Sequence, residues 1–268
     1  MLYHYVDERL ELKGLQLNRN IKRYFLLIAI IYPVGPQLAH GLVFESLTCN
    51  SQHNPIAIQS DQPQFSWIVK AKGFDRSQTA YHVVVASSPD LLDEVKADLW
   101  KSGKVLSSQS AHIKYKGGQL LPTTKYWWKV KIWDEEGKTS DWSPVNSFET
   151  GLFEESDWRE SKWISLKEDN RKSEYRFRNY QTGRMDQPVK VSSQAAGYFR
   201  KEISLVKEVS DARAYICGLG YYELYINGKK TGDHVLDPAP SNYDKIAYYV
   251  TYDATELLKP GRNALGII

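Results

Sequence analysis

The sequence of 268 residues is poor in cysteine and methionine, and neither sign of charge predominates. Two cysteines are too few for a disulfide framework or for a zinc site with four thiolate ligands. The formal net charge of +3 gives no strongly basic surface, so we expect no binding to nucleic acid. No apolar run reaches the roughly 20 residues that a membrane helix needs. We therefore expect no membrane span in the mature chain.

Aromatic residues are abundant by contrast, with 18 Tyr and 8 Trp. Together with a charged fraction of 25%, they exclude a disordered or collagen-like chain. Aromatic rings fill the cores of β-sandwiches, and they also stack on sugar rings, so both uses stay open at this point. The length is sufficient for two ordinary domains.

Residues 1–41 have the order of a signal peptide with an N-terminal extension. The segment 18–23 is basic, the segment 24–32 is apolar, and Ala39-His40-Gly41 fits a cleavage site of small residues. The acidic residues that precede the basic segment are unusual for a leader, and a buried N-terminal strand or helix is the alternative. We expect cleavage after Gly41 and a periplasmic or secreted mature protein.

Residues 42–151 predict a small antiparallel β-sandwich. Short β-branched and aromatic runs occupy 65–69, 79–86 and 126–133, and turn residues separate them. In the last run, Tyr126, Trp128, Val130 and Ile132 share one face, which should point into the core. A hairpin turn is expected at 134–137, followed by a return strand that ends at Phe148. Pro89 suits the first position of a short helical turn near 90–95.

This stretch resembles a fibronectin type III module. The pattern from Tyr126 to Ser143, with Asp134, Gly137 and Trp142 at their positions, is similar to the last strand pair of such modules. The runs Gln78–Tyr81, Val85–Ser88 and Asp98–Val105 are similar to one version in particular, the N-terminal module of bacterial α-L-rhamnosidases. Such modules usually serve as spacers or scaffolds.

Residues 152–195 are expected to be a linker or insertion, and residues 196–268 a second β domain. The linker is polar and weakly patterned, which favours a solvated loop over an anion-binding site. In the second domain, strands are expected at 198–205, 212–217, 221–226, 229–235 and 263–268. Asn227-Gly228 is the strongest hairpin signal, because a type I′ turn needs positive φ at both central residues. Gly218-Leu219-Gly220 does not have the spacing of a dinucleotide loop.

The second domain carries the more specific resemblance. The run Gly218–Lys229, the pair Asp237-Pro238, and the segments 243–245, 251–255 and 261–266 closely resemble the N-terminal jelly roll of α-L-rhamnosidases, glycoside hydrolase family 78. The resemblance implies an all-β fold, a fibronectin III-like β-sandwich followed by an incomplete jelly-roll β-sandwich. It also implies that the inverting acid and base belong to an (α/α)₆ barrel in the same chain, beyond Ile268. We therefore assign no catalytic residue.

The carboxylates near the aromatic hairpins do not suggest a hydrolytic pair. They are Glu223, Asp233, Asp237, Asp244 and Asp253. Asp233 and Asp237 flank a proline turn, where Asp is common for turn reasons, and Asp253 suits a helical cap. His82, His112 and His234 lack the spacing of zinc ligands.

One loop is the candidate binding surface. Related jelly rolls bind rhamnose, in some cases with calcium, and the resemblance carries this hypothesis to Tyr221, Tyr222 and Tyr243 as stacking rings. Calcium prefers oxygen ligands, which Asp237, Asn242 and Asp244 supply. The segment 192–197 departs from the family pattern, which favours docking onto the catalytic barrel as the use of this loop.

The sequence thus predicts a non-catalytic N-terminal portion of an exported α-L-rhamnosidase, an enzyme that removes terminal rhamnose from glycosides or polysaccharides. Two alternatives remain, a free-standing rhamnose-binding protein and a structural or adhesion module. No cofactor is expected, and calcium is left open.

Overall fold

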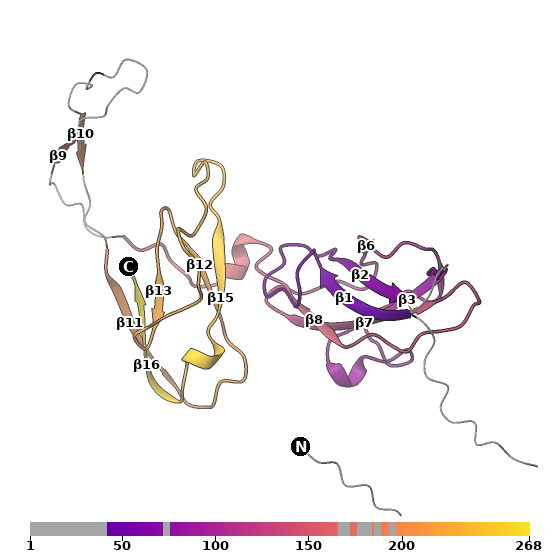
Figure 1. Ribbon diagram of the computed structural model, residues 1–268. Coiled ribbons are helices and arrows are strands. Elements are labelled where there is room, and N and C mark those ends of the chain that lie inside the picture. Colours follow the sequence, from indigo (N-terminus) through magenta and orange to yellow (C-terminus); the bar gives the residue numbers. More distant parts are fainter. Residues whose placement is uncertain (1–41, 72–75, 166–171, 176–183, 185–188, 193–196) are drawn as a thin grey trace, which may run out of the picture. The chain divides into compact units, whose positions relative to one another are not determined.

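The computed structural model describes residues 42–71, 76–165, 172–175, 184, 189–192 and 197–268. The predicted signal peptide lies outside these residues. The described residues form strands and three short 3₁₀ turns, with no α-helix among them (Figure 1). Within this part of the chain, no helix has the length and apolar character to cross a membrane.

The first domain is a sandwich of two antiparallel sheets. One sheet has the order β1-β2-β6; the other has the order β4-β3-β7-β8, with β5 also paired to β3. The strands are β1 (Leu42–Cys49), β2 (Gln64–Ala71), β3 (Ala80–Ala86), β4 (Trp100–Lys101), β5 (Val105–Leu106), β6 (Ile113–Lys114), β7 (Lys125–Trp133) and β8 (Asn146–Glu149). The predicted sandwich is confirmed.

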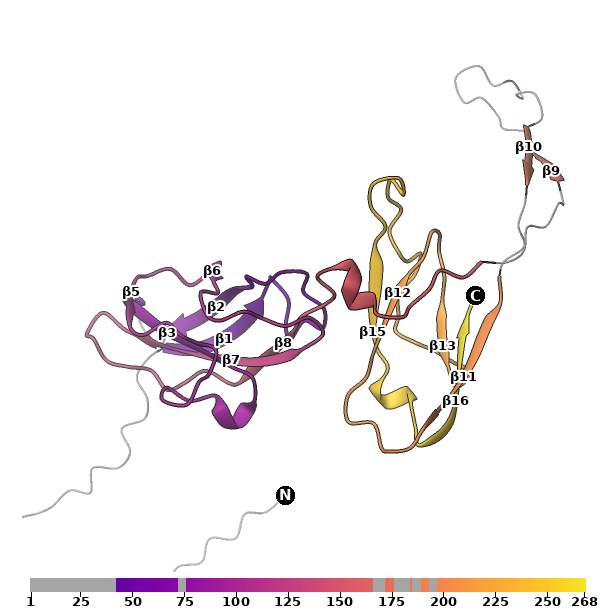
Figure 2. The same ribbon diagram turned by 180° about the vertical axis from the view of Figure 1, so that it is seen from behind.

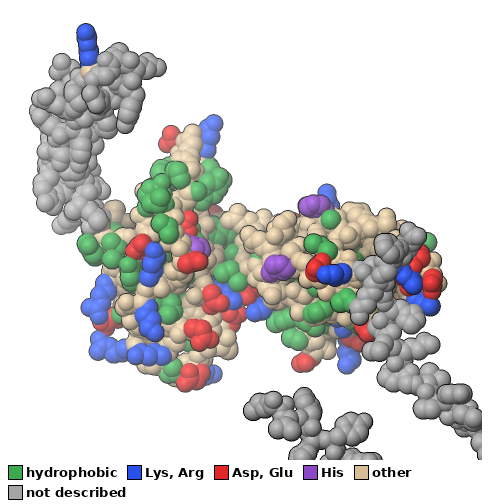
Figure 3. Space-filling view, in the orientation of Figure 1, with side chains coloured by type: hydrophobic (Ala, Val, Ile, Leu, Met, Phe, Trp, Pro, Cys, Tyr) green, Lys and Arg blue, Asp and Glu red, His purple; other side chains and the backbone are tan. Residues whose placement is uncertain are grey.

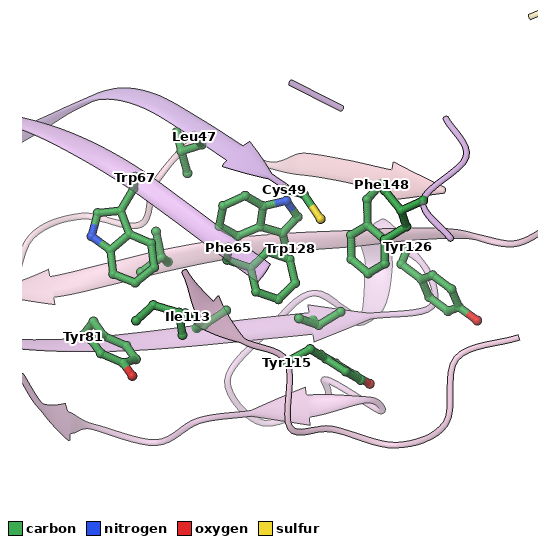
Figure 4. Packing of buried hydrophobic residues seen from close by; sticks show 14 of the residues in the cluster. Leu47, Cys49, Phe65, Trp67, Tyr81, Ile113, Tyr115, Tyr126, Trp128 and Phe148 are labelled. Carbon is green, nitrogen blue, oxygen red and sulfur yellow. The ribbon is translucent and has the colours of Figure 1, made fainter. Parts of the chain in front are cut away.

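The inner faces of these sheets enclose an aromatic core (Figure 4). Phe65 of β2 lies 4.6 Å from Trp128 of β7 and 5.7 Å from Phe148 of β8, measured between ring centroids. The predicted inward face of β7 is confirmed, because Tyr126, Trp128, Val130 and Ile132 are at most 3% exposed. Here the aromatic residues serve the core rather than a sugar.

Strand β3 is buried on both of its faces. Its outward residues Val84 and Ala86 are covered by Leu92 and Ala97, which follow the turn η1 (Pro89–Leu91). Pro89 stands at the start of this turn, as its fixed φ favours.

The segment after β7 differs from a regular return strand. The predicted turn is present, with Gly137 at φ +76° and its N–H donating to the Asp134 carbonyl. Beyond it, the hydroxyls of Ser140 and Ser143 accept the N–H groups of Ile132 and Val130. Side chains therefore replace part of the backbone ladder, and β8 is confined to 146–149.

The segment after the first domain contains the turn η2 (Glu155–Trp158) and two strands. Strands β9 (Lys172–Tyr175) and β10 (Val189–Ser192) pair antiparallel within the expected insertion, where we had predicted a loop. The two strands satisfy each other's backbone N–H and C=O groups. The polar sequence of this segment has no clear periodicity, so it does not indicate the pairing.

The second domain has a sheet of order β11-β16-β13-β14 and a pair β12-β15 (Figure 2). The strands are β11 (Phe199–Leu205), β12 (Arg213–Cys217), β13 (Leu224–Ile226), β14 (Lys229–Lys230), β15 (Tyr249–Asp253) and β16 (Gly261–Ile267), with the turn η3 (Thr255–Leu257) between the last two. Leu224, Ile226, Tyr252 and Ala254 are the buried centre. The fold is all-β, as predicted.

Two predicted strands of this domain are shorter than expected. The hairpin at Asn227-Gly228 is present, but β13 begins at Leu224 and β14 ends at Lys230. Residues 221–223 belong instead to a loop held by backbone hydrogen bonds from Tyr222 to Asp237 and between Glu223 and Ile268. Cys217, predicted to be buried, is only partly buried, whereas Cys49 is buried.

Candidate functional site

Two loops of the second domain bring some of the predicted site residues together. The Tyr222 N–H donates to the Asp237 carbonyl over 3.0 Å, which joins the loop before β13 to the loop after β14. The Tyr222 hydroxyl donates to the Ile216 carbonyl over 3.0 Å. Burial raises the pKa of the Tyr222 phenol, so this group remains a hydrogen-bond donor across the physiological range.

His234 and Tyr252 belong to the same cluster and were not predicted. The Nδ1 atom of His234 lies 2.5 Å from Oδ2 of Asp237, and its ring centroid lies 5.2 Å from that of Tyr252. Tyr222 also packs against Tyr252, with 6.4 Å between the two ring centroids. The spacing His234-x-x-Asp237 was a usable signal for this pair, because a tight turn brings such residues side by side.

The other predicted residues lie in a separate turn. The Asn242 carbonyl accepts the N–H groups of Lys245 and Ile246, and its side-chain oxygen accepts the Asp244 N–H. No hydrogen bond joins Asp237 to Asn242 or Asp244 in the described part of the chain. Tyr221 and Tyr243 are exposed to solvent.

Two of the three side chains proposed for calcium have other partners. Asp237 faces His234, and Asn242 binds within its own turn. Among the described residues, no group of three or more His, Cys, Asp or Glu side chains is placed to hold a metal ion. Calcium binding by Asp237, Asn242 and Asp244 stays a prediction.

Of the five carboxylates near the aromatic hairpins, Asp237 faces His234, and two others are also placed for structural roles. Glu223 accepts from the Lys230 ammonium and from the Tyr225 hydroxyl, both over 2.7 Å. Asp253 accepts the Thr255 N–H and lies 2.9 Å from Arg213. Such contacts with a cation or a backbone N–H are those of structural carboxylates.

A shallow groove of about 310 Å³ lies on the sheet of β11, β16 and β13. It is lined by Tyr198, Phe199, Arg200, Tyr225, Gly228 and the segment 264–268. No carboxylate lines it, whereas inverting hydrolysis needs two carboxyl groups about 6.5–9.5 Å apart. The groove therefore lacks the groups for glycoside hydrolysis.

Large apolar side chains are exposed on the two loops that carry the predicted site. We call them the loop surface: Leu219, Tyr221, Val235, Leu236, Tyr243, Ile246 and Tyr248. Their exposed fractions range from 43% to 75%. Figure 3 shows hydrophobic side chains gathered on the second domain over the loop that precedes β15. Exposed apolar patches of this kind commonly mark interaction surfaces.

Comparison with known proteins bears on both domains. Residues 44–154 match the family model described as the Rha78A-like, N-terminal immunoglobulin domain. Residues 207–268 match the α-L-rhamnosidase N-terminal domain. The chain therefore carries the two N-terminal domains of α-L-rhamnosidases. The immunoglobulin description agrees with the predicted fibronectin-like sandwich, because the two share this architecture.

Individual proteins similar to this chain are α-L-rhamnosidases. An α-L-rhamnosidase of Formosa agariphila is 59% identical over 232 residues, which are 87% of this chain and 24% of the relative. The solved α-L-rhamnosidase from Dictyoglumus thermophilum is 39% identical with a TM-score of 0.73, covering 84% of this chain and 25% of that one. The one from Aspergillus terreus is 27% identical with a TM-score of 0.65, covering 84% of this chain and 23% of that one.

The chain thus spans about a quarter of the length of the α-L-rhamnosidases that it matches. It corresponds to their non-catalytic N-terminal portion. In those relatives, this portion shares a chain with the catalytic domain.

Proposed function

We propose that this chain is the N-terminal portion of an exported α-L-rhamnosidase and that its loop surface docks onto the catalytic domain. The full-length enzyme would remove terminal α-L-rhamnose from glycosides or polysaccharides, with the catalytic (α/α)₆ barrel as the partner. The observation that carries the proposal is the exposure of seven large apolar side chains on two loops of the second domain.

The docking role is supported by how firmly the two loops are held. The hydrogen bond from Tyr222 to Asp237, the contact of Asp237 with His234, and the turn at Asn242 fix the backbone beneath the exposed rings. A preorganised apolar surface loses little conformational entropy when a partner covers it. The same features suit a scaffold better than a catalytic centre.

Sugar binding is the second candidate function. The exposed rings of Tyr221 and Tyr243 support it, because an aromatic face can stack on the apolar face of a sugar. A rhamnose-containing glycan would then be the ligand. The calcium-dependent form of this hypothesis rests on Asp237, Asn242 and Asp244, of which Asp237 faces His234 and Asn242 accepts within its own turn.

Two measurements test the proposal. The purified chain should release no p-nitrophenol from p-nitrophenyl α-L-rhamnoside, and turnover by the pure chain would contradict the non-catalytic role. For docking, the chain is titrated calorimetrically into the part of the Formosa agariphila relative that lies beyond the matched 24%. The double variant Tyr221→Ser, Leu236→Ser should bind about tenfold more weakly or worse.

Leu106→Ser is the matched control, because Leu106 is 81% exposed but lies in the first domain. It should bind like the parent. Equal binding by parent and double variant, or no binding by the parent, would refute docking at the loop surface. Titration with L-rhamnose, with and without calcium, then tests the second candidate.

We also propose a periplasmic or secreted location. The segment 18–41 supports it, because a basic stretch is followed by an apolar stretch and then by small residues.

A further inference from the structure

The first and second domains share a buried contact. The guanidinium of Arg213, the first residue of β12, binds the carboxylate of Glu149, the last residue of β8. The contact is bidentate, with 2.7 Å from Nε to Oε2 and 2.6 Å from Nη2 to Oε1. The two side chains are only 10% and 8% exposed. Planar pairs of this kind are the strongest and the most demanding in geometry.

Further acidic groups of the second domain surround Arg213. Asp211 and Asp253 lie 2.7 and 2.9 Å from its Nη1 atom. Burial by itself lowers the pKa of Arg213, but the hydrogen-bonded Glu149 and the two aspartates outweigh it and raise this pKa above its ordinary value. Arg213 is therefore held as a cation between carboxylates of both domains.

A second contact lies beside the ion pair. The hydroxyl of Tyr249, in β15, accepts the Leu152 N–H over 2.9 Å. The Tyr249 ring meets the Trp158 ring edge-on, with 5.6 Å between centroids. At Gly151, an added Cβ would overlap the Tyr249 hydroxyl, so the fit requires glycine there.

We infer that Glu149, Gly151, Leu152, Trp158, Arg213 and Tyr249 form a joint that makes the two domains unfold as one cooperative unit. Separating the domains would leave Glu149 without its guanidinium and Tyr249 without its backbone partners, and both losses are costly for buried groups.

The distribution of tryptophan allows a direct test. All eight tryptophans lie at or before position 163, and six of them lie in the first domain. In a Trp158→Phe, Trp163→Phe background, which keeps an aromatic ring beside Tyr249, tryptophan fluorescence reports on the first domain alone. A substitution in the second domain can shift this signal only through coupling between the domains.

The test substitution is Arg213→Met in that background, followed by urea unfolding. We expect the fluorescence midpoint to fall by about 1 M urea, and the transition followed by far-UV circular dichroism to separate into two steps. Arg262→Met is the matched control, because Arg262 pairs with Glu202 within the second domain and is 80% exposed. It should leave the fluorescence midpoint unchanged.

A milder pair of variants covers the case in which Arg213→Met prevents the second domain from folding. Tyr249→Phe removes only the hydroxyl at the joint, and Tyr248→Phe removes one from the exposed neighbour. The fluorescence midpoint should fall for Tyr249→Phe and not for Tyr248→Phe. An unchanged fluorescence midpoint in both Arg213→Met and Tyr249→Phe would overturn the proposed coupling of the domains, even if the second domain itself is destabilised.

Discussion

At the scale of single residues, His82 is a histidine whose surroundings disfavour the protonated, positively charged imidazole. It is 9% exposed, and its Nε2 atom has no hydrogen-bond partner among the described residues. Its Nδ1 atom lies 3.4 Å from Glu94, and its ring packs on Trp142. Burial lowers the pKa of His82 below its ordinary 6.5, with a smaller lowering from Lys131 that Glu94 opposes.

This shift predicts a loss of stability in mild acid. Below about pH 6.5 the unfolded chain takes up a proton at this histidine that the folded chain resists, so the free energy of unfolding falls as the pH drops from 7 towards 5. His82→Gln should flatten that slope. Urea unfolding of both proteins at pH 7, 6 and 5 measures it, with His112→Gln as an exposed control. Parallel slopes for parent and His82→Gln would contradict the assignment.

At the scale of elements, the turn between β13 and β14 depends on two left-handed residues. Asn227 has φ +51° and Gly228 has φ +80°. The Asn227 side chain also accepts the Ala264 N–H and donates to the Leu257 carbonyl, which ties this turn to β16 and η3. The turn therefore organises the sheet beyond its own hairpin.

Gly228→Ala should destabilise the chain by roughly 1–2 kcal/mol, because a Cβ disfavours the left-handed conformation. No atom lies close to the added methyl, so the cost is one of backbone conformation alone. Gly118→Ala is the control, since that site is equally open and does not have a left-handed φ. Thermal or urea unfolding compares them, and equal stabilities for the two variants would be inconsistent with the turn type.

The elements also show how far the sequence could be interpreted. The alternation from Tyr126 to Ile132 and the dipeptide Asn227-Gly228 predicted their structures, because local periodicity and turn chemistry decide both. The early end of β14 and the late start of β13 depend on Asp237 and Ile268, which are distant in sequence from Tyr222 and Glu223. The pairing of His234 with Asp237 was missed because histidines were considered only as metal ligands. Arg213 and Glu149 are separated by 64 positions, and nothing local marks them as partners.

At the scale of the whole molecule, export is the prediction with the simplest outcome. Expressed with its first 41 residues in a Gram-negative host, the protein should appear in the periplasm or the medium. Its mass should be that of a chain beginning at Leu42. Leu27→Arg with Ile30→Arg interrupts the apolar segment 24–32 and should keep the protein uncleaved in the cytoplasm. A full-length protein in both cases would refute the leader.

Among the described residues, the order β11-β16-β13-β14 makes β11 and β14 the outer strands of the larger sheet in the second domain. Both carry charge there: Arg200, Lys201 and Glu202 on β11, and Lys229 and Lys230 on β14. Lysine and other charged side chains on a sheet edge discourage the addition of a foreign strand. The domain can thus expose an apolar surface on its loops while its charged edge strands resist amyloid-like strand addition.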